Sequence, residues 1–151
     1  TRVVVADLHK IALSTDSGVT FTPIQAPTEL TYVTAATVDD GGRLWVGGRE
    51  GVWVSDNNGG SWHSQPGLYV PNVSGIYFDK PSKQVLVTAN RPSTTVFMVN
   101  TGTMRVSYED TGWTLRMTRV VGDHLIGVTP FDGVVVAPRM VATPVKAYGG
   151  K

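Results

Sequence analysis

The feature that most constrains this chain is a two-strand pattern that occurs four times along it. Residues 44–55 read as an apolar strand, a short polar turn with glycine, and a second apolar strand. Residues 126–137 follow the same order, and so do residues 3–14 and 86–99. The last residues of the four segments are separated by steps of 41, 44 and 38 positions. A near-constant spacing of this kind indicates a repeat architecture.

Two more strand candidates lie between successive hairpins. One group follows the hairpin, at 20–24, 61–65 and 105–108, and the other precedes the next hairpin, at 31–38, 73–78 and 115–121. Each unit is therefore a four-stranded antiparallel meander of ~40–45 residues, which is typical of a β-propeller blade. We predict an all-β fold, a single partial propeller over residues 1–151. It would consist of about three and a half to four blades, near 1–27, 28–69, 70–112 and 113–148.

The ends of the chain are out of phase with this repeat. Residue 1 falls at the second strand of a unit, and residues 140–148 offer one further strand. Either four blades close tightly or, as we expect, the chain is part of a larger ring, completed by a second copy or by an N-terminal half. The continuous apolar runs at 3–5 and 134–136 predict strands that are covered on both faces.

The turn after each third strand has its own chemistry. Residues 14–21 read Ser-Thr-Asp-Ser-Gly-Val-Thr-Phe and residues 55–62 read Ser-Asp-Asn-Asn-Gly-Gly-Ser-Trp. These segments resemble the Asp-box (BNR repeat), written Ser-x-Asp-x-Gly-x-Thr-Trp, of sialidase-like, sortilin-type and photosystem-assembly-factor propellers. An Asp or Asn side chain can accept hydrogen bonds from the turn's own N–H groups, and Gly supplies a positive φ. We predict structural roles for Ser14, Asp16, Gly18, Phe21, Ser55, Asn57, Gly59 and Trp62.

The resemblance admits both enzymes and binding proteins. A sialidase would carry an Arg-Ile-Pro segment near its start, which does not occur here, and scattered arginines such as Arg43 and Arg116 are interpreted as loop-surface residues. A glycosidase needs two carboxylates about 5–10 Å apart. Asp7, Glu50 and Asp132 occupy nearly equivalent turns, but we favour solvated turn acids. We predict no catalytic residues, no metal site and no cofactor, since Cys is absent and no zinc or phosphate-binding motif occurs.

The best candidate for a binding surface is the set of turns between second and third strands. These turns diverge in sequence while their flanking strands stay alike, as expected where a repeat protein contacts a ligand, although loop drift gives the same pattern. Trp113 lies in a loop between units, where its indole could stack on a sugar or a peptide or pack in the core. The candidate binding residues are Asp7, His9, Arg49, Glu50, Asn90, Arg91, Trp113, Phe131 and Asp132.

Charge excludes some classes of partner. The formal net charge is +1, from 13 basic and 12 acidic residues, so nothing predicts nucleic-acid binding. No run approaches the ~20 apolar residues of a membrane span.

The leading interpretation is a non-catalytic binding or scaffold module for a protein or carbohydrate ligand. The alternatives are a fragment of an Asp-box glycoside hydrolase and a purely structural repeat. The sequence leaves the compartment open, and the resemblance favours a secreted or periplasmic protein.

Overall fold

The computed structural model describes residues 1–90, 94–139 and 143–144, and these residues form strands and turns without any helix. Among them there is accordingly no helix long and apolar enough to cross a membrane. The strands are β1 (Val3–Asp7), β2 (Lys10–Ser14), β3 (Thr22–Ile24), β4 (Val33–Val38), β5 (Leu44–Gly48), β6 (Gly51–Ser55), β7 (His63–Ser64), β8 (Val73–Asp79), β9 (Gln84–Ala89), β10 (Thr95–Asn100), β11 (Val106–Asp110), β12 (Met117–Val121), β13 (His124–Val128), β14 (Val134–Pro138) and β15 (Thr143–Pro144).

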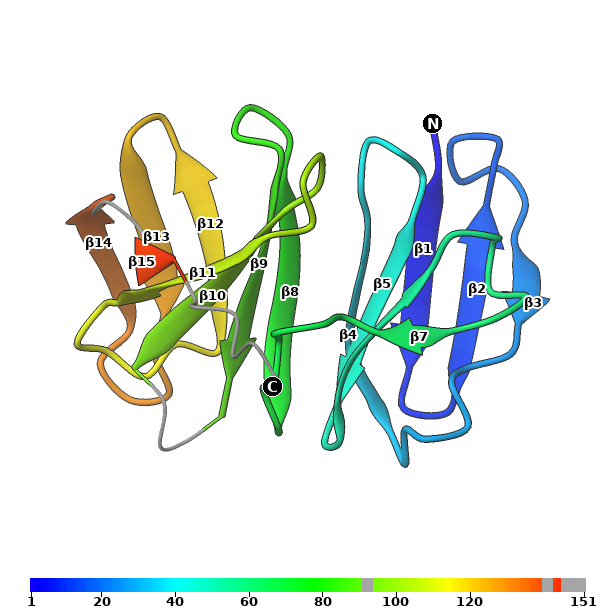
Figure 1. The fold of residues 1–151 in the computed structure, drawn as a ribbon, viewed down its shortest axis with the longest axis horizontal. Helices are drawn as coiled ribbons and strands as arrows, with labels where there is room; N and C mark the ends of the chain where they lie inside the picture. The colour runs from blue at the N-terminus through cyan, green and yellow to red at the C-terminus, as the bar shows by residue number, and fades with distance from the viewer. Residues whose placement is uncertain (91–93, 140–142, 145–151) are drawn as a thin grey trace, which may run out of the picture.

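The strands form four antiparallel meanders in chain order (Figure 1). The first sheet is β1-β2-β3, the second β4-β5-β6-β7, the third β8-β9-β10-β11, and the fourth β12-β13-β14. β15 pairs antiparallel with β11, as a fifth strand at the edge of the third sheet. Of the further strand predicted within 140–148, positions 140–142 and 145–148 lie outside the described residues.

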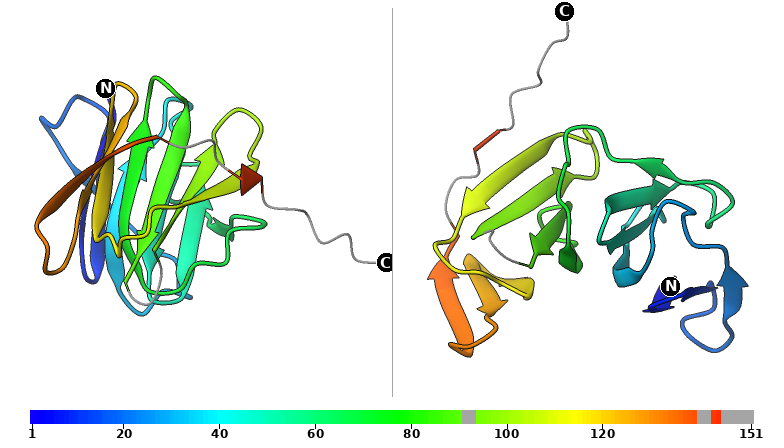
Figure 2. Two further views of the ribbon diagram at one scale, coloured as in Figure 1. Left: turned by 90° about the vertical axis from the view of Figure 1, so that its left-hand side faces the viewer. Right: turned by 90° about the horizontal axis from the view of Figure 1, so that it is seen from below.

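The four sheets stack face to face as an open arc (Figure 2, right). Three apolar clusters fill the spaces between successive sheets. The largest lies between the second and third sheets and includes Trp45, Val54 and Val87, which are fully buried. β1, β4, β8 and β12 contact one another in that order along the arc. The all-β prediction is confirmed, and the four sheets are arranged as the blades of a partial propeller.

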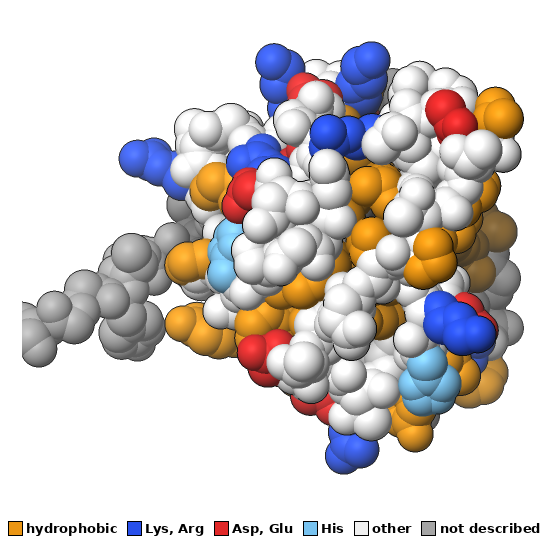
Figure 3. Space-filling model, turned by 90° about the vertical axis from the view of Figure 1, so that its right-hand side faces the viewer, with side chains coloured by type: hydrophobic (Ala, Val, Ile, Leu, Met, Phe, Trp, Pro, Cys, Tyr) orange, Lys and Arg blue, Asp and Glu red, His pale blue; other side chains and the backbone are white. Residues whose placement is uncertain are grey.

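The prediction that the two valine runs are covered on both faces is wrong. The residues alternate instead, so that Val4 and Val135 pack against a neighbouring sheet whereas Val5, Val134 and Val136 are exposed. The physical reason is position, because the first and fourth sheets end the arc and each has a neighbour on only one face. Exposed hydrophobic side chains also lie among polar ones on the side of the molecule that β3 borders (Figure 3).

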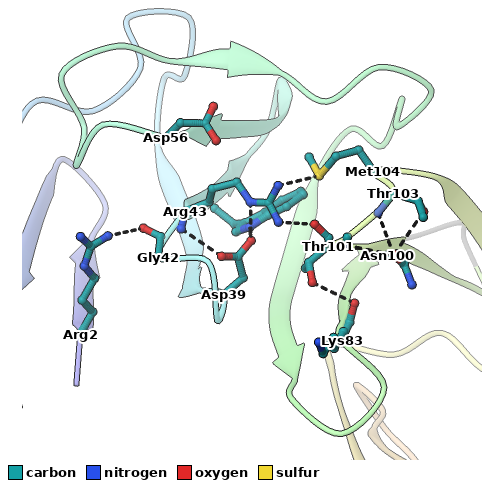
Figure 4. Close-up of polar contacts among 12 residues, drawn as sticks. Arg2, Asp39, Gly42, Arg43, Asp56, Lys83, Asn100, Thr101, Thr103 and Met104 are labelled. Carbon is teal, nitrogen blue, oxygen red and sulfur yellow. Dashed lines mark hydrogen bonds and ion pairs between the residues drawn. The ribbon is translucent and has the colours of Figure 1, made fainter.

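A buried ion pair fastens the second sheet to the third (Figure 4). Arg43 Nε lies 2.7 Å from Oδ2 of Asp39, whose carboxylate is fully buried and also accepts a hydrogen bond from Trp45 Nε1 at 3.0 Å. The same guanidinium donates to the carbonyl of Thr101 in the β10–β11 turn and contacts Met104 Sδ at 3.0 Å. Arg43 therefore joins two sheets, and its interpretation as a loop-surface residue is wrong.

Candidate functional site

Three of the turns between second and third strands, β1–β2, β5–β6 and β13–β14, lie at one edge of the arc, the lower edge in Figure 1, and β9 ends at the same edge. The loops that join one sheet to the next reach the same edge, because strand direction alternates along each meander, so that β3, β7 and β11 run toward this edge and β4, β8 and β12 start from it. We call this edge the turn edge. The turns that resemble Asp-boxes lie at the opposite edge.

An open hollow of ≈ 490 Å³ lies at the turn edge. Its described lining comes from three sheets: Thr34, Ser74, Asn90, Thr114, Arg116, Pro130 and Phe131. The size falls in the range of small-molecule sites, about 300–1,000 Å³. No carboxylate occurs among these lining residues, and the one charged group is the exposed guanidinium of Arg116.

Three of the lining residues occupy the same place in successive sheets. Thr34 and Ser74 stand at matching β-bulges, where β4 and β8 each insert one unpaired residue opposite β5 and β9. Each follows a buried valine, Val33 or Val73, and Arg116 follows the buried Leu115 in the same way just before β12. Bulges re-aim side chains, and here they place two hydroxyl groups in the lining of the hollow.

Hydroxyl groups fasten this wall to the backbone of the next sheet. Thr34 Oγ1 lies within hydrogen-bonding distance of the carbonyl oxygens of Val73 at 2.5 Å and of Gly47 at 3.1 Å. Thr88 Oγ1 is 3.1 Å from the carbonyl oxygen of Arg116, in the fourth sheet. The start of each first strand is therefore held against its neighbour, and the hollow is largely pre-formed.

Glu50 is held by the loop that precedes β4. Its carboxylate accepts hydrogen bonds from the hydroxyl of Thr31 at 2.6 Å and from the backbone N–H of Thr31 at 3.1 Å. These bonds lower the pKa of Glu50, the side-chain bond most strongly. A general acid of a glycosidase needs a raised pKa instead. Glu50 thus ties the β5–β6 turn to the loop between β3 and β4.

Asp110 makes a similar tie that the sequence did not reveal. Its carboxylate accepts from the backbone N–H of Gly112 at 3.0 Å and from the hydroxyl of Thr94 at 2.7 Å, and these bonds lower its pKa. The tie joins the β9–β10 turn to the loop that carries Trp113. The Trp113 side chain is exposed, directly before Thr114 of the hollow.

The other predicted binding residues divide between the hollow and its surroundings. Asn90 and Phe131 line it, and Phe131 is largely exposed. Arg49 is also exposed, in the β5–β6 turn. Asp7 accepts a hydrogen bond from the N–H of Leu8 at 2.6 Å. The ring of His9 is tilted against that of Tyr32, with 5.0 Å between the ring centroids. The N–H of Asp132 donates to Thr129 Oγ1 at 2.8 Å. Arg91 lies outside the described residues.

At the opposite edge, Asp16 organises the first turn that resembles an Asp-box. Its carboxylate accepts bonds from the hydroxyl of Ser14 at 2.6 Å and from the hydroxyl and N–H of Thr20 at 2.6 Å and 2.9 Å. These bonds, led by the one from Ser14, hold the pKa of Asp16 far below its usual value. The Ser14 hydroxyl in turn accepts from the N–H of Gly18, whose φ is 91°. Phe21 after the turn is partly exposed.

The second such turn repeats the pattern with an amide. Asn57 Oδ1 accepts from the Ser55 hydroxyl at 2.9 Å and from the N–H of Ser61 at 2.9 Å, and the N–H of Gly59 donates to Ser55 Oγ at 2.8 Å. Trp62 Nε1 donates to the carbonyl of Gln25, in the loop after β3, at 2.9 Å. Both turns stabilise the backbone locally.

Among the described residues no group of three or more His, Asp or Glu side chains is placed to hold a metal ion. The sequence matches no protein-family model and no curated protein. The resemblance to Asp-box propellers therefore stays a prediction that is based on the two turns.

Proposed function

We propose that the chain is a non-catalytic binding module whose ligand occupies the hollow at the turn edge. The observation that carries the proposal is the lining of that hollow. Three successive sheets contribute Thr34, Ser74 and Arg116 from one equivalent position, and their backbones are tied together before any ligand arrives. A pre-formed concave site with convergent polar groups is the usual form of a ligand site.

The chemistry of the hollow favours a carbohydrate ligand. Hydroxyl, amide and guanidinium groups can exchange hydrogen bonds with sugar hydroxyls, and the exposed rings of Phe131 and Trp113 offer apolar faces beside them. The guanidinium of Arg116 adds preference for a ligand that bears a carboxylate or is rich in acceptors.

A glycosidase is supported less well. The described lining of the hollow holds no carboxylate, and Glu50 already binds Thr31 through both oxygens. The hydrolysis of a glycoside needs two carboxylates, one of which is protonated. The resemblance to Asp-box propellers is compatible with either reading, since those turns lie at the other edge.

An oligosaccharide array tests the proposal. The wild-type chain is expected to bind one class of oligosaccharide, and Arg116→Ala and Phe131→Ala to weaken that binding by about tenfold each, because a charge-assisted hydrogen bond or an apolar contact contributes ~1–2 kcal/mol. Phe21→Ala is the matched control, since it removes an exposed ring from the opposite edge. The proposal fails if all three variants bind as the wild type does, or if the wild type binds no oligosaccharide. Turnover of fluorogenic glycosides that is lost in Glu50→Gln would favour the hydrolase instead.

A further inference from the structure

The outer face of the fourth sheet has the side chains of a buried interface. The repeat makes four residues equivalent: Ser14, Ser55, Val99 and Ala137. The residues directly before them, in the same order, are Leu13, Val54, Met98 and Val136. The first three of these side chains are 6%, 0% and 1% exposed, whereas Val136 is 61% exposed. Val54 and Met98 belong to the apolar clusters that their sheets share with the following sheet.

The same difference in exposure is found at Val134, two positions before Val136. Its equivalents Ile11, Val52 and Val96 are all nearly fully buried, and Val134 is exposed. Val128, which pairs with Val134, and Ile126, which pairs with Val136, extend the same face across β13. The face is therefore of the type that meets a following sheet within this chain.

The outer face of the first sheet is of the complementary type. Val5 of β1 is equivalent to Val46 of β5 and Val87 of β9, which face the preceding sheet. Val46 and Val87 are both fully buried, and Val5 is 46% exposed. Ala12 pairs with Val5 and continues this face onto β2.

We propose that the two outer faces bind a second copy of this chain, head to tail, so that two arcs close into one ring. The contact would repeat the packing already present three times within the chain, with the fourth sheet of one copy against the first sheet of the other. Such a heterologous contact closes when the rotation per copy allows it. Two copies supply four sheets each, which stays within the ~4–8 blades of ordinary propellers, whereas three copies would exceed that number.

Cysteine cross-linking tests both the partner and its orientation, because the chain has no cysteine of its own. The equivalents of Val136 and Val5, Val54 and Val87, lie in one core cluster. Val5→Cys mixed with Val136→Cys, treated with a short bis-maleimide, is expected to give a cross-linked dimer. Each variant alone is expected to give none. Cross-linking of Val136→Cys to itself would contradict the head-to-tail contact. A ladder of species larger than a dimer from the double variant Val5→Cys/Val136→Cys would contradict its closure into a pair.

Light scattering after size exclusion measures the assembly without cross-linking. The wild-type chain is expected to elute with twice the mass of one chain, and Val136→Lys as a folded monomer by circular dichroism. Val19→Lys is the control, since Val19 is an exposed valine in the turn between β2 and β3, outside the strands that carry the two faces, and it is expected to stay dimeric. A wild-type chain that remains a monomer at all concentrations would overturn the proposal.

Discussion

Replacing Arg43 with methionine removes the cation that faces the buried carboxylate of Asp39. Removing one partner of a buried pair costs ~3–5 kcal/mol, because the other charge stays buried. Arg43 keeps 20% of its side chain exposed and Asp39 retains its bond from Trp45, so we expect the lower end, about 3 kcal/mol. For a domain of this size that corresponds to a fall in Tm of about 6–12 °C.

Urea unfolding followed by circular dichroism would give the free energy directly. Arg2→Met is the control, since Arg2 only donates one exposed hydrogen bond to the carbonyl of Gly42 and should cost less than ~0.5 kcal/mol. Adding Asp39→Asn to Arg43→Met should recover part of the loss, because no uncompensated charge then remains. A free energy of unfolding of Arg43→Met within ~0.5 kcal/mol of the wild type would contradict this role of Arg43.

Three further results are expected. The pKa of Asp16 is lowered in the folded state, so the stabilisation of the fold by the Asp16 carboxylate is present above pH ~4 and is lost as the pH falls below that. Thermal melts should therefore show Asp16→Asn to be less stable than the wild type at pH 7 and to converge with it in acid. Plots of Tm against pH that stay parallel for the two proteins would contradict this. Gly47→Ala should cost about 1–3 kcal/mol in urea unfolding, because its Cβ would lie 2.5 Å from Val73 Cγ1, whereas Gly102→Ala, with no atom closer than 3.4 Å, should cost less than ~0.5 kcal/mol. Thr31→Val should raise the pKa of Glu50 toward its ordinary value in a carboxyl NMR titration, since the largest cause of the lowering is the Thr31 hydroxyl; an unchanged titration would exclude that cause.

The sequence predicted the hairpins because alternating apolar residues and the turns between them are local signals. The predicted strands at 20–24 and 61–65 shorten to Thr22–Ile24 and His63–Ser64 for a local reason as well. The N–H groups of Thr20 and Ser61 bind the side chains of Asp16 and Asn57, so these residues belong to the turns. The strand predicted at 31–38 begins only at Val33, because the N–H of Thr31 donates to the Glu50 carboxylate instead of joining the sheet.

The hollow could not be predicted in the same way. Thr34, Ser74 and Arg116 are about forty residues apart, and only the stacking of three sheets brings them into one lining. Nothing local distinguishes Arg116 from other arginines. A signal did exist, since each of the three follows an apolar residue at the start of a first strand, and an alignment of the repeat on those positions would have found them.

The hollow at the turn edge is the proposed binding site. The most direct measurement is a ¹H–¹⁵N NMR titration of the chain with an oligosaccharide selected on the array. We expect the amides of Ser74, Asn90, Thr114 and Arg116 to shift, while those of Gly18 and Gly59 at the opposite edge do not. Shifts confined to the opposite edge, or none at saturating ligand, would contradict it.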